Sequence, residues 1–237
     1  MIKTNDGSFT LKSEEYNECY HSSEGALTES LYKHVFIGYE VAKRFNYYNG
    51  EIRILDICFG LGYNTLSAIL HKPKGVKLKI FSPEIDKELV KSLKAFPYPK
   101  EFEKLKPIIE KIATNFYYQD ENIEVEVAII DAREYIKKLE NIHIVYQDAF
   151  SPKVNPELWS LEYFKDIVSI LNKNGVITTY SVSSKVRCAF YKLNLNMYTH
   201  PYKNIRKGTI ASFVDLDFPK VYFEKKLKRI KCKTIKV

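Results

Sequence analysis

Two glycines and three carboxylates follow four apolar runs of the sequence, at the point where each run ends. They are Gly60 and Gly62 after residues 52–57, Glu84 after 76–81, Asp131 after 125–130 and Asp148 after 142–146. Apolar runs of this length are typical of buried strands. In an open α/β sheet, ligands bind beyond the carboxyl ends of the strands. The spacing therefore predicts one ligand site, built from the ends of four strands.

Each position suits part of a nucleoside-containing cofactor. Gly60 and Gly62 allow a ligand close to the backbone. Glu84 can hold a pair of ribose hydroxyls, and Asp131 can accept from an adenine amino group. A dinucleotide is disfavoured, because its G-x-G-x-x-G fingerprint needs glycine where Thr65 stands. The predicted cofactor is S-adenosylmethionine, bound by Phe59, Gly60, Gly62, Asn64, Glu84, Asp131, Ala132 and Asp148.

A purely structural role stays open for these residues. The glycines could serve a tight turn, Glu84 could stabilise a helix N-terminus, and Asp131 could cap a helix that opens at Ala132. The loop after the fourth strand has the same ambiguity. Pro152 and Pro156 stiffen it and would hold Asp148 in place, but an ordinary turn with Asn155 as a helix cap is the alternative.

Hydrophobic periodicity predicts alternating strands and helices. Strands are expected at 52–57, 76–81, 125–130, 142–146, 176–180, 197–202 and 209–214. Helices are expected at 26–45, 64–71, 86–96, 100–116, 133–139, 156–171 and 185–193, with 100–116 as an inserted or lid-like helix. This order indicates an α/β, Rossmann-like fold, mostly parallel with an antiparallel edge strand, as in class I S-adenosylmethionine-dependent methyltransferases. We expect an N-terminal extension over residues 1–48 and the methyltransferase domain over 49–237.

Composition limits the class of protein. The 237 residues suffice for one α/β domain with a small appendage, and 45% hydrophobic residues argue against disorder. The four cysteines lack C-x-x-C spacing and the histidines lack metal-ligand spacing, so we expect no metal and a reduced, cytoplasmic chain. No signal region or apolar run of transmembrane length is present, so we expect no membrane association.

The basic balance favours a polyanionic partner. Net charge is +8, and the excess is strongest in residues 225–231 and at Lys203, Arg206 and Lys207. Aromatic residues make up 14% of the chain, enough to stack on bases as well as to fill a core. A solvated charged surface is the alternative explanation of both basic groups.

Two motifs resemble those of a known family. Residues 55–64, LDICFGLGYN, resemble the GFGTGxN loop of the MnmC methyltransferase domain, and residues 148–159, DAFSPKVNPELW, resemble its DGFAPxxNPxxW signature. Segments 7–11, 20–29, 185–187 and 206–208 are also similar to that family. Cys58 and Leu61 depart from the pattern, in place of its first glycine and its threonine.

The resemblance implies a tRNA-modifying enzyme. The family methylates the amine of 5-aminomethyl(-2-thio)uridine at the wobble position, and many members carry a fused FAD-dependent oxidase. This sequence has no second nucleotide-binding pattern, so we expect the stand-alone, MnmD-like form without an FAD domain. The anticodon stem-loop of tRNA would contact Lys203, Arg206 and Lys207.

The chemistry suggests roles for the remaining residues. The amine must be neutral to attack, so Asp148 would accept its hydrogen bond, orient it and help take up its proton. Phe150 would wall the site, and Tyr20 or Tyr180 would bound the base or the sulfonium. Two alternatives are an aminopropyltransferase of the same fold, acting on polyamines, and a non-catalytic tRNA-binding module that has lost cofactor affinity.

Overall fold

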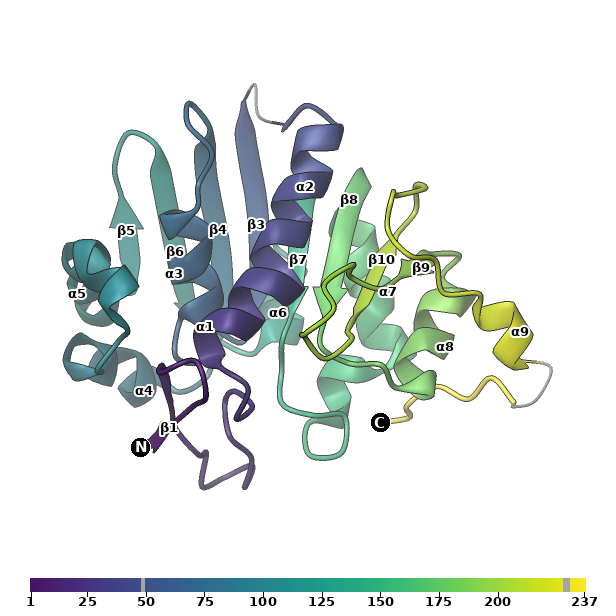
Figure 1. The fold of residues 1–237 in the computed structure, drawn as a ribbon, viewed down its shortest axis with the longest axis horizontal. Helices are drawn as coiled ribbons and strands as arrows, with labels where there is room; N and C mark the ends of the chain where they lie inside the picture. The colour runs from purple at the N-terminus through teal and green to yellow at the C-terminus, as the bar shows by residue number, and fades with distance from the viewer. Residues whose placement is uncertain (48–49, 228–230) are drawn as a thin grey trace.

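The chain forms a central sheet with helices on both faces (Figure 1). The computed structural model describes residues 1–47, 50–227 and 231–237, so the expected boundary between residues 48 and 49 lies outside the described residues. Within this part, the main sheet has eight strands in the order β5-β6-β4-β3-β7-β8-β10-β9. The five strands from β6 to β8 are parallel, while β5, β10 and β9 each pair antiparallel with a neighbour. The fold prediction is confirmed.

The strands of the main sheet are β3 (Glu51–Ile57), β4 (Lys77–Glu84), β5 (Tyr117–Gln119), β6 (Ile123–Ile129), β7 (Ile142–Gln147), β8 (Leu171–Thr179), β9 (Asn196–Tyr198) and β10 (Thr209–Ser212). The α-helices are α1 (Ala26–Glu29), α2 (Phe36–Arg44), α3 (Tyr63–Leu70), α4 (Lys87–Ser92), α5 (Lys106–Asn115), α6 (Ala132–Ile136), α7 (Leu161–Ile170), α8 (Ser184–Lys192) and α9 (Phe223–Leu227). A π-helical segment, Ser30–Val35, joins α1 to α2. A short hairpin pairs β1 (Ile2–Lys3) with β2 (Phe9–Thr10).

Strand alternation divides the core into two clusters. In β3, Ile52 and Ile54 face one side of the sheet, and Leu55 and Ile57 face the other. Helices α1 to α3 and α5 pack on the first side, and α6 to α8 pack on the second. Burial on both faces explains why the central strands are continuous apolar runs.

The N-terminal segment lies at the carboxyl ends of the parallel strands (Figure 1). The Tyr63 hydroxyl at the start of α3 donates to the Phe9 carbonyl at 2.9 Å and accepts from the Phe9 N–H at 3.3 Å. The Asp6 carboxylate accepts from the Thr28 N–H at 2.9 Å. These contacts fix residues 1–28 over the region where the sequence predicts a ligand site.

Several predicted elements need correction. The helix expected at 156–171 is a 3-10 turn, Pro156–Trp159, followed by α7, and Ser160 rather than Asn155 provides the cap. Strand β8 begins at Leu171, earlier than expected, and β5 was not predicted at all. The single helix expected at 100–116 is a 3-10 segment, Lys100–Leu105, followed by α5, and Phe102, Ile109 and neighbouring apolar residues are buried in the core. Its inserted or lid-like role stays a prediction.

The cysteines differ from expectation. The structure joins Cys188 and Cys232 in a disulfide, with 5.5 Å between their Cα atoms, so the prediction of four reduced cysteines is wrong. None of the described helices combines the length and apolar character needed to cross a bilayer. Among the described residues, no three His, Cys, Asp or Glu side chains group in a way that could hold a metal ion.

Candidate active site

A cavity of about 1,040 Å³ opens at the carboxyl ends of β3, β4, β6 and β7. It is at the upper end of the range for ligand pockets. Predicted site residues that line it are Tyr20, Phe59, Gly60, Asn64, Glu84, Asp131, Ala132, Asp148, Phe150 and Tyr180. Gly62, Lys203, Arg206 and Lys207 do not line it. The strand-end groups thus meet as the sequence predicts, while their individual roles stay predictions.

The loop between β3 and α3 depends on left-handed backbone. Gly62, at φ +73°, precedes the first turn of α3, and a Cβ there would lie 2.9 Å from the Phe59 ring. Cys58 also has a positive φ, +64°, at the position where the family pattern has glycine. Burial raises the pKa of the Cys58 thiol well above its ordinary value. Cys58 is therefore a neutral packing residue and not a reactive thiolate.

Glu84 connects this loop to the end of β4. Its Oε2 accepts from the Gly60 N–H at 2.8 Å, and its Oε1 accepts from the N–H groups of Ile85 at 2.8 Å and Asp86 at 2.9 Å. Burial raises the pKa of Glu84 despite these three donors. A carboxylate offers about four acceptor positions, so one remains on Oε2 for a ligand.

Asp131 has the structural role that the sequence left open. Its carboxylate accepts from the Arg133 N–H at 2.8 Å, capping α6, and pairs with the Arg133 guanidinium at 2.6 Å. The hydrogen bond from Arg133 is the main reason why the pKa of Asp131 is lowered. Because Asp131, Ala132 and Arg133 all line the cavity, the cap and a ligand contact are compatible.

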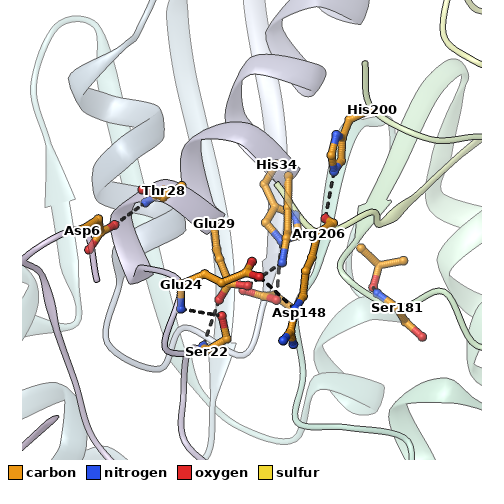
Figure 2. A network of polar contacts seen from close by, with 12 residues as sticks. Asp6, Ser22, Glu24, Thr28, Glu29, His34, Asp148, Ser181, His200 and Arg206 are labelled. Carbon is orange, nitrogen blue, oxygen red and sulfur yellow. Dashed lines mark hydrogen bonds and ion pairs between the residues drawn. The ribbon is translucent and has the colours of Figure 1, made fainter. Parts of the chain in front are cut away.

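Asp148 is held by two side chains from other elements, Asn64 of α3 and His34 of the π-helical segment. Asn64 Nδ2 donates to Asp148 Oδ2 at 2.9 Å, and His34 Nε2 lies 3.5 Å from Asp148 Oδ1. The other ring nitrogen of His34 is hydrogen-bonded to Thr178 Oγ1 at 2.8 Å. Figure 2 shows the imidazole directed from its helix toward Asp148. The carboxylate keeps 19% of its side-chain surface exposed, toward the cavity.

These partners determine the charge of Asp148. Burial alone would raise its pKa, but His34, then His21 and Asn64, outweigh burial, and the pKa of Asp148 is lowered. Asp148 is therefore ionised near neutral pH and is a weak base. The hypothesis that it takes up the proton of an amine loses support, whereas a role as hydrogen-bond acceptor gains support.

A second carboxyl group, Asp56, lies on the same network. Asn64 Nδ2 also donates to Asp56 Oδ1 at 3.3 Å, and Thr65 Oγ1 donates to Asp56 Oδ2 at 2.7 Å. Burial, with a further contribution from Asp148, raises the pKa of Asp56 to about 8. One buried carboxyl is thus neutral and its neighbour is charged, a division of states common in active sites.

Aromatic side chains close the cavity over Asp148. The Phe150 ring lies 4.8 Å from the Tyr16 ring and 5.0 Å from the Tyr20 ring, centroid to centroid. The Tyr180 hydroxyl donates to the Ala149 carbonyl at 3.0 Å. Trp159 Nε1 donates to the Phe150 carbonyl at 2.7 Å. These bonds, together with the prolines, hold the loop after β7.

The predicted tRNA contacts are mostly engaged within the protein. Arg206 pairs with Glu24 of the N-terminal segment at 2.8 Å, as Figure 2 shows, and Lys207 Nζ donates to the His200 carbonyl at 2.9 Å. Lys203 is exposed on the same loop. Residues 228–230 of the basic C-terminal run lie outside the described residues.

The sequence analysis did not identify His34, His21 or Asp56 as site residues. His34 is a lone histidine within an expected amphipathic helix, and Asp56 lies inside an apolar run. Both positions are typical of ordinary core residues. A π-helical segment is often found at functional sites, but it carries no sequence signal of its own.

Comparisons with known proteins agree with this geometry. A family model described as S-adenosyl-L-methionine-dependent methyltransferase matches residues 97–213. The crystal structure of MNMC2 from Aquifex aeolicus is 34% identical, with a TM-score of 0.82, covering 95% of this chain and 73% of that one.

Two curated relatives extend the comparison. An uncharacterized protein of Methanocaldococcus jannaschii is 34% identical over 196 residues, 80% of this chain and 52% of its own. The tRNA 5-methylaminomethyl-2-thiouridine biosynthesis bifunctional protein MnmC of Burkholderia pseudomallei is 25% identical over 212 residues. That match covers 80% of this chain and 31% of MnmC, so the chain spans about half and about a third of these relatives. The cavity and these similarities together establish that the chain belongs to the MnmC-type family of S-adenosylmethionine-dependent methyltransferases.

Proposed function

We propose that the protein transfers a methyl group from S-adenosylmethionine to the amine of 5-aminomethyl(-2-thio)uridine at the wobble position of tRNA. The product is 5-methylaminomethyl(-2-thio)uridine, and the reaction takes place in the cytoplasm. The observation that carries the proposal is the ionised Asp148 carboxylate, which faces a cavity walled by Phe150 and Tyr20. An amine that must be desolvated and oriented is the substrate such a group suits.

The residues of the glycine loop fit an adenosyl cofactor. Gly60 leaves its part of the cavity wall without a side chain, Gly62 provides the left-handed turn into α3, and Glu84 keeps one acceptor position for a ribose hydroxyl. Asp131 and Ala132 would border the adenine. When bound, S-adenosylmethionine supplies a methyl carbon made electrophilic by its sulfonium. A cavity of about 1,040 Å³ leaves room for a nucleoside beside the cofactor.

Asp148 would act on the amine as a fixed hydrogen-bond acceptor. The amine loses a proton to solvent before it attacks, since an ammonium has no lone pair. Asp148 accepts a hydrogen bond from an N–H of the neutral amine. This bond directs the lone pair of the amine nitrogen at the methyl carbon. As the C–N bond forms and the C–S bond breaks, positive charge develops on nitrogen, and the carboxylate stabilises that charge.

A polyamine substrate is the alternative within the same fold. Glu18 accepts from the Ser151 N–H at 3.0 Å and Glu29 pairs with Lys33, but further acids, among them Glu14, Glu15 and Glu157, also line the cavity. The choice of acceptor in the assay below separates a polyamine from an RNA. A non-catalytic module would not require these strand-end groups to meet in one cavity.

The test is methyl transfer from labelled cofactor to three acceptors: tRNA carrying 5-aminomethyluridine, unmodified tRNA and spermidine. We expect transfer to the first alone. Methyl transfer to spermidine would show that the active site takes a polyamine amine instead, and would count against the tRNA substrate. If calorimetry detects no cofactor binding and no acceptor is methylated, the protein is a binding module.

A further inference from the structure

Arg187 is a half-buried cation without an acidic partner. It lies in α8, and its Nε donates to Thr209 Oγ1 at 3.0 Å. Within the part of the chain that the structure describes, no carboxylate lies within 4.0 Å of its guanidinium. Burial, unopposed by any nearby acid, lowers the pKa of Arg187. Other guanidiniums near the cavity differ, because Arg133 and Arg206 each pair with a carboxylate.

The terminal nitrogens of Arg187 remain available to a ligand. Neither Nη1 nor Nη2 hydrogen-bonds to the described residues, and neither is among the fully buried polar atoms. Removing part of the water around a guanidinium costs free energy unless an anion takes the place of that water. The planar fork matches the geometry of a phosphate or carboxylate in a bidentate pair. Arg187 is therefore oriented by Thr209 and lacks only the anion.

Arg187 does not itself line the cavity, but two hydrogen bonds and the backbone connect it to Tyr180, which does. Thr209 Oγ1 donates to the Ser181 carbonyl at 2.6 Å. Ser181 follows Tyr180, whose hydroxyl donates to the carbonyl of Ala149, the residue next to Asp148. The neighbouring loop is closely packed as well, since a Cβ on Gly208 would lie 2.3 Å from the Thr179 carbonyl oxygen. The guanidinium thus stands in a fixed position beside the wall that Tyr180 forms.

We propose that Arg187 binds a phosphodiester of the tRNA close to the nucleotide that is methylated. The inference rests on the proposed function, because an RNA substrate supplies the anion beside the target base. Phosphate contacts position a nucleic acid without reading its sequence. Arg187 is accordingly a substrate-positioning residue that sets the register of the modified nucleotide over Asp148.

The experiment compares Arg187→Gln with a matched control, Lys192→Gln. Lys192 is exposed in the last turn of α8 and does not line the cavity, so its variant removes the same charge from the same helix. For Arg187→Gln we expect the KM for modified tRNA to rise about tenfold, and the slope of log kcat/KM against log salt to fall by about 1. The control should change neither, and Arg187→Lys should fall between.

Phosphate-free 5-aminomethyluridine separates positioning from structural damage. We expect Arg187→Gln and the unaltered protein to methylate this nucleoside equally. Equal loss on the nucleoside and on tRNA would overturn the proposal, as would an unchanged KM and salt slope. If the unaltered protein methylates neither acceptor, the proposed function fails. The Arg187 site is then tested by tRNA binding alone, and equal Kd values for Arg187→Gln and Lys192→Gln would refute it.

Discussion

Replacing His34 with leucine tests how Asp148 is kept ionised. The His34 ring lies 3.5 Å from Asp148 and is the largest influence opposing burial on the pKa of that carboxyl. Without it, Asp148 keeps Asn64 and His21 but remains beside Asp56 in a buried setting. The pKa of Asp148 should therefore rise, and a fraction of the carboxylate should become protonated at pH values where the natural protein is fully active.

The size of the effect follows from the geometry. A hydrogen bond to a charged group contributes roughly 1.5–3 kcal/mol, and 3.5 Å is long for such a bond, so we take the lower end. That is about a tenfold loss in kcat/KM at neutral pH. The loss should grow as pH falls, since Asp148 in the variant then takes up a proton.

A pH profile provides the assay. In the natural protein, Asp148 stays ionised, so log kcat/KM should rise with a slope of about one below the pKa of the amine. In His34→Leu, the carboxyl titrates as well, and the slope should approach about two on the acid side. His71→Leu is the control, because His71 lies at the end of α3 and does not line the cavity. An unchanged slope in His34→Leu, with normal folding, would refute this account of Asp148.

Three further changes test the remaining parts of the site. Asp148→Asn keeps the shape but removes the charge, and should lower kcat by about 10- to 100-fold while cofactor affinity by calorimetry changes little. Gly62→Ala places a Cβ 2.9 Å from the Phe59 ring and should weaken cofactor binding, whereas Gly7→Ala, also at positive φ but in open space, should not. Asp56→Asn should raise Tm at pH 8. Because the pKa of Asp56 is raised to about 8, the stability of the natural protein falls as pH rises from about 4 to about 8. The gain in Tm from Asp56→Asn should therefore shrink as pH falls toward 4, and a gain that stays constant with pH would contradict the reasoning.

Strand ends were the part of the site that the sequence could predict. Gly60, Glu84, Asp131 and Asp148 follow apolar runs, and parallel strands bring their carboxyl ends to one edge of a sheet. The local pattern alone therefore gave both the fold and the cavity. Asp131 shows the limit of this prediction. An aspartate that caps a helix and one that lines a cavity look the same in the sequence, and Asp131 does both.

Residues that depend on tertiary contacts could not be predicted. His34 reaches Asp148 only because the N-terminal helix packs over β7 and β8. Arg206 and Lys207 looked free in the sequence, yet Glu24 and the His200 carbonyl engage them. Arg187, on a helix, has no carboxylate within 4.0 Å among the described residues. Partners far apart in sequence decide each of these cases.

The most direct test of the central claim is nucleoside analysis by mass spectrometry of modified tRNA after incubation with the protein and S-adenosylmethionine. The account predicts one added methyl on the nitrogen of 5-aminomethyl(-2-thio)uridine, and a much slower reaction with Asp148→Asn. Methylation at a ring or ribose position, or equal rates for the two proteins, would contradict it.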